Sequence, residues 1–218
     1  MIIIILLVAG LSVGGYFIYK KHQSTVSTSN QPPASQPSQT NNSPTAIPSQ
    51  VSELTNNQLA FPIADFKSRI TKKPFGIYIT PETSPVQPER FSGYHTGVDV
   101  EYEDVTEDVP VYAIAEGKVV VSETASGYGG VFVTQININN AEHNVLYGHI
   151  RPTSLPSVGQ TFNKGDQLGL LGTGYSTETD GERRHLHFSV LSDARNDIRG
   201  YVQTESALSG WIDPLSLY

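Results

Sequence analysis

The sequence contains no cysteine and has few basic residues. Without cysteine, neither a disulfide framework nor a thiolate metal site can form, so any metal must be held by histidine, aspartate or glutamate. Only 14 lysine and arginine residues stand against 21 acidic residues, which gives a net charge of -7. The acidic excess lies in the second half of the chain and argues against nucleic-acid binding, so we expect no nucleic-acid partner. An acidic surface favours solubility, and it would also attract cationic substrates or walls.

Charge is also missing from the beginning of the chain. Residues Ile2 to Tyr19 are almost all apolar or small, and as a helix they would extend about 27 Å, near the lower limit for a membrane span. A cleaved signal peptide is the alternative, but a basic leading region and a small-residue cleavage site are both missing. We therefore expect residues 1–22 to be an uncleaved transmembrane helix that contacts the membrane.

The orientation of this anchor is in conflict with one rule. Lys20 and Lys21 follow the span, and the positive-inside rule would place the rest of the chain in the cytoplasm. Two lysines are a weak bias, and the site chemistry described below favours the outside. We expect a membrane-anchored protein in which the chain beyond the span faces the cell exterior or cell wall, with a secreted form as the alternative.

Residues 23–58 have few apolar side chains and almost no charge. They are rich in serine, threonine, glutamine, asparagine and proline, and such a segment cannot bury enough surface to offset its ordering entropy. We expect a disordered linker, which would hold a domain some distance from the bilayer.

Residues 59–218 differ in pattern, because short β-rich runs alternate there with glycine and turn residues. No long segment with helical periodicity follows Tyr19. The spacing of the runs predicts an all-β domain, an antiparallel sandwich or open barrel. The expected runs are 75–79, 109–114, 117–121, 130–133, 144–147, 168–171 and 185–191.

Two short motifs contain candidate metal ligands. His95 and Asp99 lie four residues apart, too far to share a metal in a straight strand, but Gly97 between them permits a bend. His185 and His187 would point to the same face of a strand, roughly 6–7 Å apart. Two histidines and one carboxylate with an open fourth position form the ligand set of a catalytic zinc.

The other histidines carry less information. His149 follows a strand-like run in Tyr147-Gly148-His149, where a structural role is the common alternative. His22 lies in the linker, and we assign it no role. His143 lies in a polar turn, and we expect it at the surface.

Beyond the ligands, the chain resembles the lysostaphin-type (LytM-like) zinc metalloendopeptidases over most of residues 75–215. The resemblance rests on motifs that occur here in the family's order: Tyr94-His95-Thr96-Gly97-Val98-Asp99, Pro110-Val111-Tyr112-Ala113, Glu116-Gly117-Lys118-Val119-Val120, Gly127-Tyr128-Gly129-Gly130, Tyr147-Gly148-His149, Gly172-Thr173-Gly174, His185-Leu186-His187-Phe188 and Trp211-Ile212-Asp213-Pro214-Leu215.

The resemblance implies a function and a role for each candidate. His95, Asp99 and His187 would bind Zn2+, and His149 and His185 would be catalytic histidines that handle the water proton and the oxyanion. The fold would be the family's duplicated hybrid motif with a groove between loops. The substrate would be the peptide cross-links or bridges of bacterial peptidoglycan, and we expect a monomer.

The chain departs from the family's usual pattern before His185. Seven residues, 178–184, stand where the family usually has two, and about two extra residues precede Pro110. We expect both insertions in loops that border the groove, so cleavage specificity does not carry over from the family. We expect Arg183 and Arg184 to be exposed charges, with contact to substrate carboxylates as the alternative.

Two other functions compete with an active endopeptidase. Some members of the family lack ligands and regulate other wall hydrolases, so a non-catalytic wall-binding or hydrolase-activating module is one alternative. A biotinyl/lipoyl-like or sugar-phosphotransfer carrier is the other, because glycine-punctuated runs such as 158–160 and 164–166 also occur in those β folds. The histidine and aspartate upstream, at 95 and 99, do not suit a carrier.

Overall fold

The computed structural model describes residues 58–218, which lie within one compact unit. The transmembrane helix expected at 1–22 and nearly all of the linker expected at 23–58 lie outside the described residues. Among residues 58–218, no helix is long and apolar enough to cross a membrane.

The described residues form β-strands connected by loops and short 3-10 helices, with no α-helix in this part of the chain. The strands are β1 (Tyr78–Ile79), β2 (Gly93–His95), β3 (Val98–Glu101), β4 (Pro110–Tyr112), β5 (Gly117–Ala125), β6 (Gly129–Ile138), β7 (Ala141–Ile150), β8 (Thr161–Phe162), β9 (Gln167–Leu170), β10 (His185–Leu191), β11 (Tyr201–Val202) and β12 (Trp211–Ile212). The 3-10 helices are η1 (Pro152–Ser154), η2 (Thr177–Thr179), η3 (Glu205–Gly210) and η4 (Pro214–Leu217). The prediction of a mostly β fold is confirmed.

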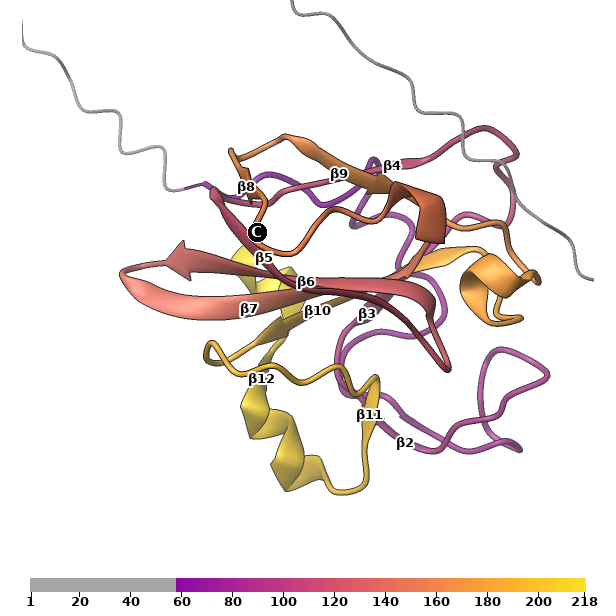
Figure 1. The fold of residues 1–218 in the computed structure, drawn as a ribbon. Coiled ribbons are helices and arrows are strands. Elements are labelled where there is room, and N and C mark those ends of the chain that lie inside the picture. Colours follow the sequence, from indigo (N-terminus) through magenta and orange to yellow (C-terminus); the bar gives the residue numbers. More distant parts are fainter. Residues whose placement is uncertain (1–57) are drawn as a thin grey trace, which may run out of the picture. The chain divides into compact units, whose positions relative to one another are not determined.

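Seven strands form the main sheet, and every pairing in the described chain is antiparallel. The order is β12-β10-β7-β6-β5-β8, and β3 also pairs with β10. Two smaller sheets consist of β1-β2-β11 and of β4-β9. Figure 1 shows β6 and β7 across the middle of the domain, with β4 and β9 on one side and β2 and β11 on the other.

An aromatic ladder aligns three strands of the main sheet. Tyr147 on β7 pairs in register with Phe132 on β6 and with Phe188 on β10, and all three side chains are fully buried. The ring centroids of Phe132 and Tyr147 lie 4.6 Å apart, and those of Tyr147 and Phe188 lie 5.3 Å apart. A slip of β10 by one residue would turn all of its side chains to the other face of the sheet and would separate Phe188 from Tyr147. The packing of these rings therefore favours the observed register of β10.

His143 is not at the surface, contrary to the prediction. β7 begins at Ala141, so His143 belongs to a strand rather than to the turn that the polar sequence predicts. The side chain is buried, and its Nδ1 donates a hydrogen bond to the Leu191 carbonyl at 2.9 Å. The pairing of β7 with β10 brings the Leu191 carbonyl within reach of His143. Because Leu191 lies 48 residues away in the chain, no sequence pattern near His143 indicates this acceptor.

Candidate metal centre and catalytic groove

The chain bends between His95 and Asp99, as the glycine between them permits. His95 ends β2 in the three-stranded sheet, and Asp99 lies on β3 in the seven-stranded sheet. A Cβ atom at Gly97 would lie 2.4 Å from the Phe188 carbonyl oxygen, so only glycine allows the chain to pass β10 this closely. The bend brings His95 Nε2 to 3.2 Å from Asp99 Oδ1.

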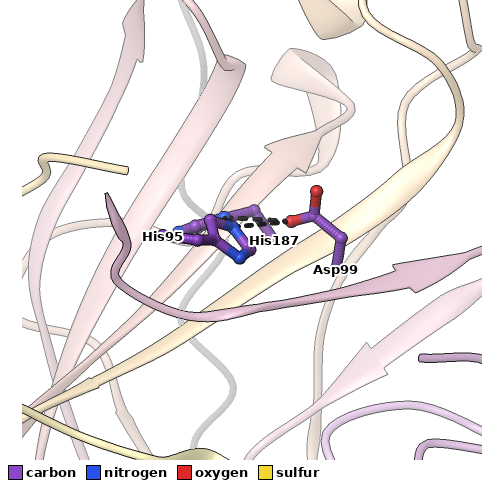
Figure 2. Close-up of side chains that lie close together, drawn as sticks. All are labelled: His95, Asp99 and His187. Atoms are coloured by element: carbon purple, nitrogen blue, oxygen red, sulfur yellow. Dashed lines mark hydrogen bonds and ion pairs between the residues drawn. The ribbon is translucent and has the colours of Figure 1, made fainter. Parts of the chain in front are cut away.

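Pairing of β3 with β10 supplies the third member of the cluster. Asp99 and His187 are register partners, and His187 Nδ1 lies 3.1 Å from Asp99 Oδ1. His95 Nε2 lies 3.0 Å from His187 Nδ1, which closes a triangle of three ligand atoms (Figure 2). Three ligands of a tetrahedral zinc, each about 2.0–2.2 Å from the ion, lie about 3.3 Å from one another. The three side chains therefore fit zinc, and they form the one such cluster within residues 58–218.

Hydrogen bonds from the rings orient two of the imidazoles. His95 Nδ1 lies 3.1 Å from the Pro74 carbonyl oxygen, so we assign the proton to Nδ1 and the lone pair to Nε2, which faces Asp99. His185 Nδ1 lies 2.9 Å from the Arg183 carbonyl oxygen, so the same assignment leaves Nε2 of His185 unprotonated. That nitrogen lies 3.4 Å from Asp99 Oδ2.

His149 enters the site through an irregularity in β7. Gly130 on β6 pairs with Ile150, and the next residue, Val131, pairs with Gly148, so His149 has no register partner. Its φ is 62°, in the left-handed region. An unpaired residue in such a bulge changes the direction of its side chain, and the His149 ring centroid lies 4.1 Å from that of His185.

Burial keeps three of the four site histidines neutral. It lowers the pKa of His149 to about 3 and lowers the pKa of His187, and burial together with the nearby Arg183 guanidinium lowers the pKa of His185. Burial opposes the charged form of Asp99, but the surrounding histidines and Arg183 outweigh it and hold its pKa well below its usual range. At neutral pH the site therefore offers one carboxylate and unprotonated imidazole nitrogens, which are the forms that bind a metal or accept a proton.

Arg183 is buried beside the cluster, contrary to the prediction of an exposed charge. Its Nη2 donates to Asp99 Oδ2 at 2.7 Å and to Glu101 Oε1 at 2.7 Å, and its Nε donates to Glu101 Oε2 at 2.9 Å. Arg184 is also buried, and its guanidinium donates to the carbonyls of Val105 and Glu107. Both arginines turn inward because they have acceptors from β3 and from the loop that follows it.

A groove of about 340 Å³ opens over the cluster. Asp99 and the three histidines 149, 185 and 187 line it, whereas His95 lies beneath. The remaining wall includes Phe91, Tyr128, Ile198, Arg199, Tyr201 and Gln203. The buried hydroxyl of Tyr128 has no hydrogen-bond partner among the described residues.

The seven-residue insertion borders this groove, as expected, through Glu182 and Arg183. Arg90 connects the insertion to the loop before β2, because its guanidinium contacts Glu182 Oε1 at 2.7 Å and Asp180 Oδ2 at 3.3 Å. Asp180 Oδ2 also accepts a hydrogen bond from the Gly127 amide at 2.7 Å. The insertion is thereby held between two other loops of the wall.

A buried ion pair lies behind another part of the wall. Lys73 Nζ donates to Glu89 Oε2 at 2.5 Å and to the Tyr201 hydroxyl at 3.0 Å. Both charged side chains are about 2–3% exposed. The Tyr201 ring lies 5.2 Å from the His95 ring, so this pair supports the groove at the metal cluster.

Several residues around the site are not among the candidates that the sequence motifs predict. The alternation of Asp99 and Glu101 on one strand places both carboxylates on the same face and could have identified Glu101. Arg183, Lys73 and Glu89 carry no such signal, because their partners lie at least 16 residues away in the chain.

Comparison with known proteins places the domain in a family. Residues 93–198 match the family model described as Peptidase family M23, so the domain that contains them belongs to this family of metallopeptidases. No curated protein sequence matches the chain.

Similar solved structures include Csd3 of Helicobacter pylori, with 22% identity over 67% of this chain and 35% of that one, and a TM-score of 0.43. LytU is similar with 25% identity over 67% of this chain and 81% of that one, and a TM-score of 0.44. A zinc-containing peptidase from Vibrio cholerae is similar with 24% identity over 64% of this chain and 40% of that one, and a TM-score of 0.40. The match thus spans well under half of the Csd3 and Vibrio cholerae chains.

Proposed function

We propose that this protein is a zinc-dependent endopeptidase that hydrolyses peptide cross-links or bridges of bacterial peptidoglycan. One observation carries the proposal: three ligand atoms, from His95, Asp99 and His187, lie 3.0–3.2 Å from one another beside two neutral histidines in a groove. Membership of a metallopeptidase family supports the same activity.

In this proposal each residue of the site has a distinct task. His95, Asp99 and His187 would hold zinc, which supplies Lewis-acid activation of water and of the scissile carbonyl when bound. His185 lines the groove, and the hydrogen bond of its Nδ1 leaves Nε2 unprotonated, so Nε2 would accept the proton of the attacking water. His149, whose ring lies beside that of His185, would stabilise the developing oxyanion or return the proton to the leaving amine.

The proposal extends to the location of the domain. We propose that residues 1–22 anchor the chain in the membrane, that 23–58 form a spacer, and that the domain acts outside the cell, where its substrate lies. A protease-accessibility assay on intact cells would detect the domain outside, and protection of the domain until the cells are lysed would contradict this location.

Digestion of defined peptidoglycan tests the activity. The full-length chain should release peptide products identifiable by mass spectrometry with zinc present and none after chelation. His187→Ala should abolish zinc content and cleavage together, whereas His22→Ala, the matched control, should retain both. Retained cleavage in His187→Ala would contradict the assigned metal site. A zinc-free protein that cleaves nothing but stimulates another wall hydrolase would instead establish the non-catalytic alternative.

A further inference from the structure

Arg183 connects two groups of the site that we assign to different tasks. Its side chain donates to Oδ2 of Asp99, and its backbone carbonyl accepts a hydrogen bond from Nδ1 of His185. The residue lies immediately before β10, at the end of the seven-residue insertion. One residue therefore contacts both a candidate metal ligand and a candidate proton acceptor.

The two oxygens of Asp99 have different surroundings. Oδ1 lies 3.2 Å from His95 Nε2 and 3.1 Å from His187 Nδ1, whereas Oδ2 accepts the Arg183 hydrogen bond at 2.7 Å and lies 3.4 Å from His185 Nε2. Charge-assisted bonds of this length are among the strong ones. Arg183 thus engages one oxygen and leaves the other directed at the two imidazoles.

Glu101 holds the guanidinium in this position. It lies two residues after Asp99 on the same face of β3, and it accepts two hydrogen bonds from Arg183, at 2.7 Å and 2.9 Å. The Arg183 side chain is 1% exposed, and the side chains of Asp99 and Glu101 are 2% and 10% exposed. Two buried carboxylates on one strand face need a cation between them, and a planar guanidinium can bond to both at once.

We propose that Arg183 is a positioning residue of the metal centre, which holds Asp99 so that Oδ1 alone is presented to zinc. The pairing of Arg183 with Glu101 leaves the three-residue group with one net negative charge, the same as Asp99 alone. Arg183 therefore orients the ligand without removing the negative charge that attracts the cation. This inference rests on the proposed function, because it assigns the cluster to zinc.

Zinc affinity of the full-length chain tests the inference, measured by competition with a chromophoric chelator. Substitution of groups that orient metal ligands typically costs 10–100-fold in metal affinity. We expect a loss of this size in Arg183→Gln and in Arg183→Lys, because an ammonium cannot bond to both carboxylates in the same geometry. Arg184→Lys is the matched control, since its guanidinium contacts backbone carbonyls away from the cluster, and its zinc affinity should stay within about threefold of the unsubstituted chain.

A double-mutant cycle separates positioning from general damage to the fold. Glu101→Gln should weaken zinc binding, and it should add little in the Arg183→Lys background, because both substitutions disrupt one connected group. The cobalt-substituted protein gives a spectroscopic readout: visible absorption should weaken in Arg183→Gln, because the freed Oδ2 can raise the coordination number. Circular dichroism of the metal-free variants identifies any that fail to fold, in which case Arg183→Lys and Glu101→Gln decide.

Unchanged zinc affinity in folded Arg183→Lys would overturn the inference, and so would an unchanged cobalt spectrum in folded Arg183→Gln. So would full additivity of the Arg183→Lys and Glu101→Gln losses. Neither measurement uses peptidoglycan, so a chain that binds zinc through Arg183-oriented Asp99 but cleaves no substrate would contradict only the proposed function. A chain that cleaves peptidoglycan while Arg183→Lys retains full zinc affinity would contradict only the role of Arg183.

Discussion

The imidazole rings of His149 and His185 lie 4.1 Å apart, centroid to centroid, although His149 is the next-to-last residue of β7 and His185 begins β10. Neither ring belongs to the triangle of ligand atoms, and both line the groove. The bulge at His149 and the register of β10 together produce this arrangement. The pair therefore separates proton transfer from metal binding in our proposal.

We expect His149→Ala and His185→Ala to lose catalysis but to retain zinc. A positioned general acid or base typically contributes 10²–10⁴-fold, so kcat on a peptidoglycan peptide should fall by about that factor. Zinc content at saturating metal should match the unsubstituted chain, in contrast to His187→Ala, which loses a ligand. If either variant loses zinc together with activity, the assignment of that histidine to proton transfer is wrong.

Zinc should raise the thermal stability of the chain. A ligand that binds only the folded state, present at 100–1,000 times its dissociation constant, contributes about 2.7–4.1 kcal/mol. For a domain of this size that corresponds to a Tm increase of roughly 5–15 °C, measurable by scanning calorimetry with and without zinc. Asp99→Asn should abolish most of the increase. An equal increase in Asp99→Asn would mean that zinc stabilises the fold elsewhere.

Glu89→Gln should destabilise the domain strongly, because it leaves the buried Lys73 ammonium without its carboxylate. Removal of one partner of a buried ion pair costs about 3–5 kcal/mol, measurable by urea unfolding at pH 7. Glu116→Gln is the control, since that side chain is exposed, and surface changes usually stay within about 0.5 kcal/mol.

The Glu89 effect should also depend on pH. Burial by itself would raise the pKa of Glu89. The hydrogen bonds that Glu89 accepts from Lys73 and from the Phe91 amide outweigh burial, so the pKa of Glu89 is lowered. A lowered pKa gives stability that is present above the unfolded-state value of about 4.3 and is lost as the pH falls through the folded-state value. The difference between the unsubstituted chain and Glu89→Gln should therefore be constant near neutrality and shrink below about pH 4. A difference that grows on acidification would contradict the pairing.

Glycine should be tolerated better than alanine at His149. The left-handed φ of 62° costs a residue with a Cβ atom about 1–2 kcal/mol, and glycine avoids this cost. We expect His149→Gly to be about 1 kcal/mol more stable than His149→Ala by urea unfolding. Asn137 provides the control, because it is exposed on β6 and has no positive φ. At that position the alanine variant should be more stable than the glycine variant. The same order at both positions would argue against the left-handed conformation of His149.

Short-range patterns determined much of the fold. Apolar β-rich runs bounded by glycine predicted β5, β6, β7, β9 and β10, because local alternation is enough to mark a half-buried or buried strand. The strand that contains His185 and His187 and the bend at Gly97 are likewise local features. Strand boundaries are predicted less accurately. β7 begins three residues before the expected run 144–147, so His143 lies in a buried strand and not in the predicted surface turn.

Motifs in the sequence thus identify which residues are chemically suited to the site: the histidine and aspartate at 95 and 99, the two histidines of β10, and His149 through its family resemblance. The surroundings of these residues depend instead on how the strands pair. The sequence around Arg183 predicts an exposed charge, because the partners of Arg183, Asp99 and Glu101, lie more than 80 residues earlier in the chain. The pairing of β3 with β10 brings them together, and burial then requires each charge to have a partner. Contacts of that range depend on strand register, which no local pattern around Arg183 contains.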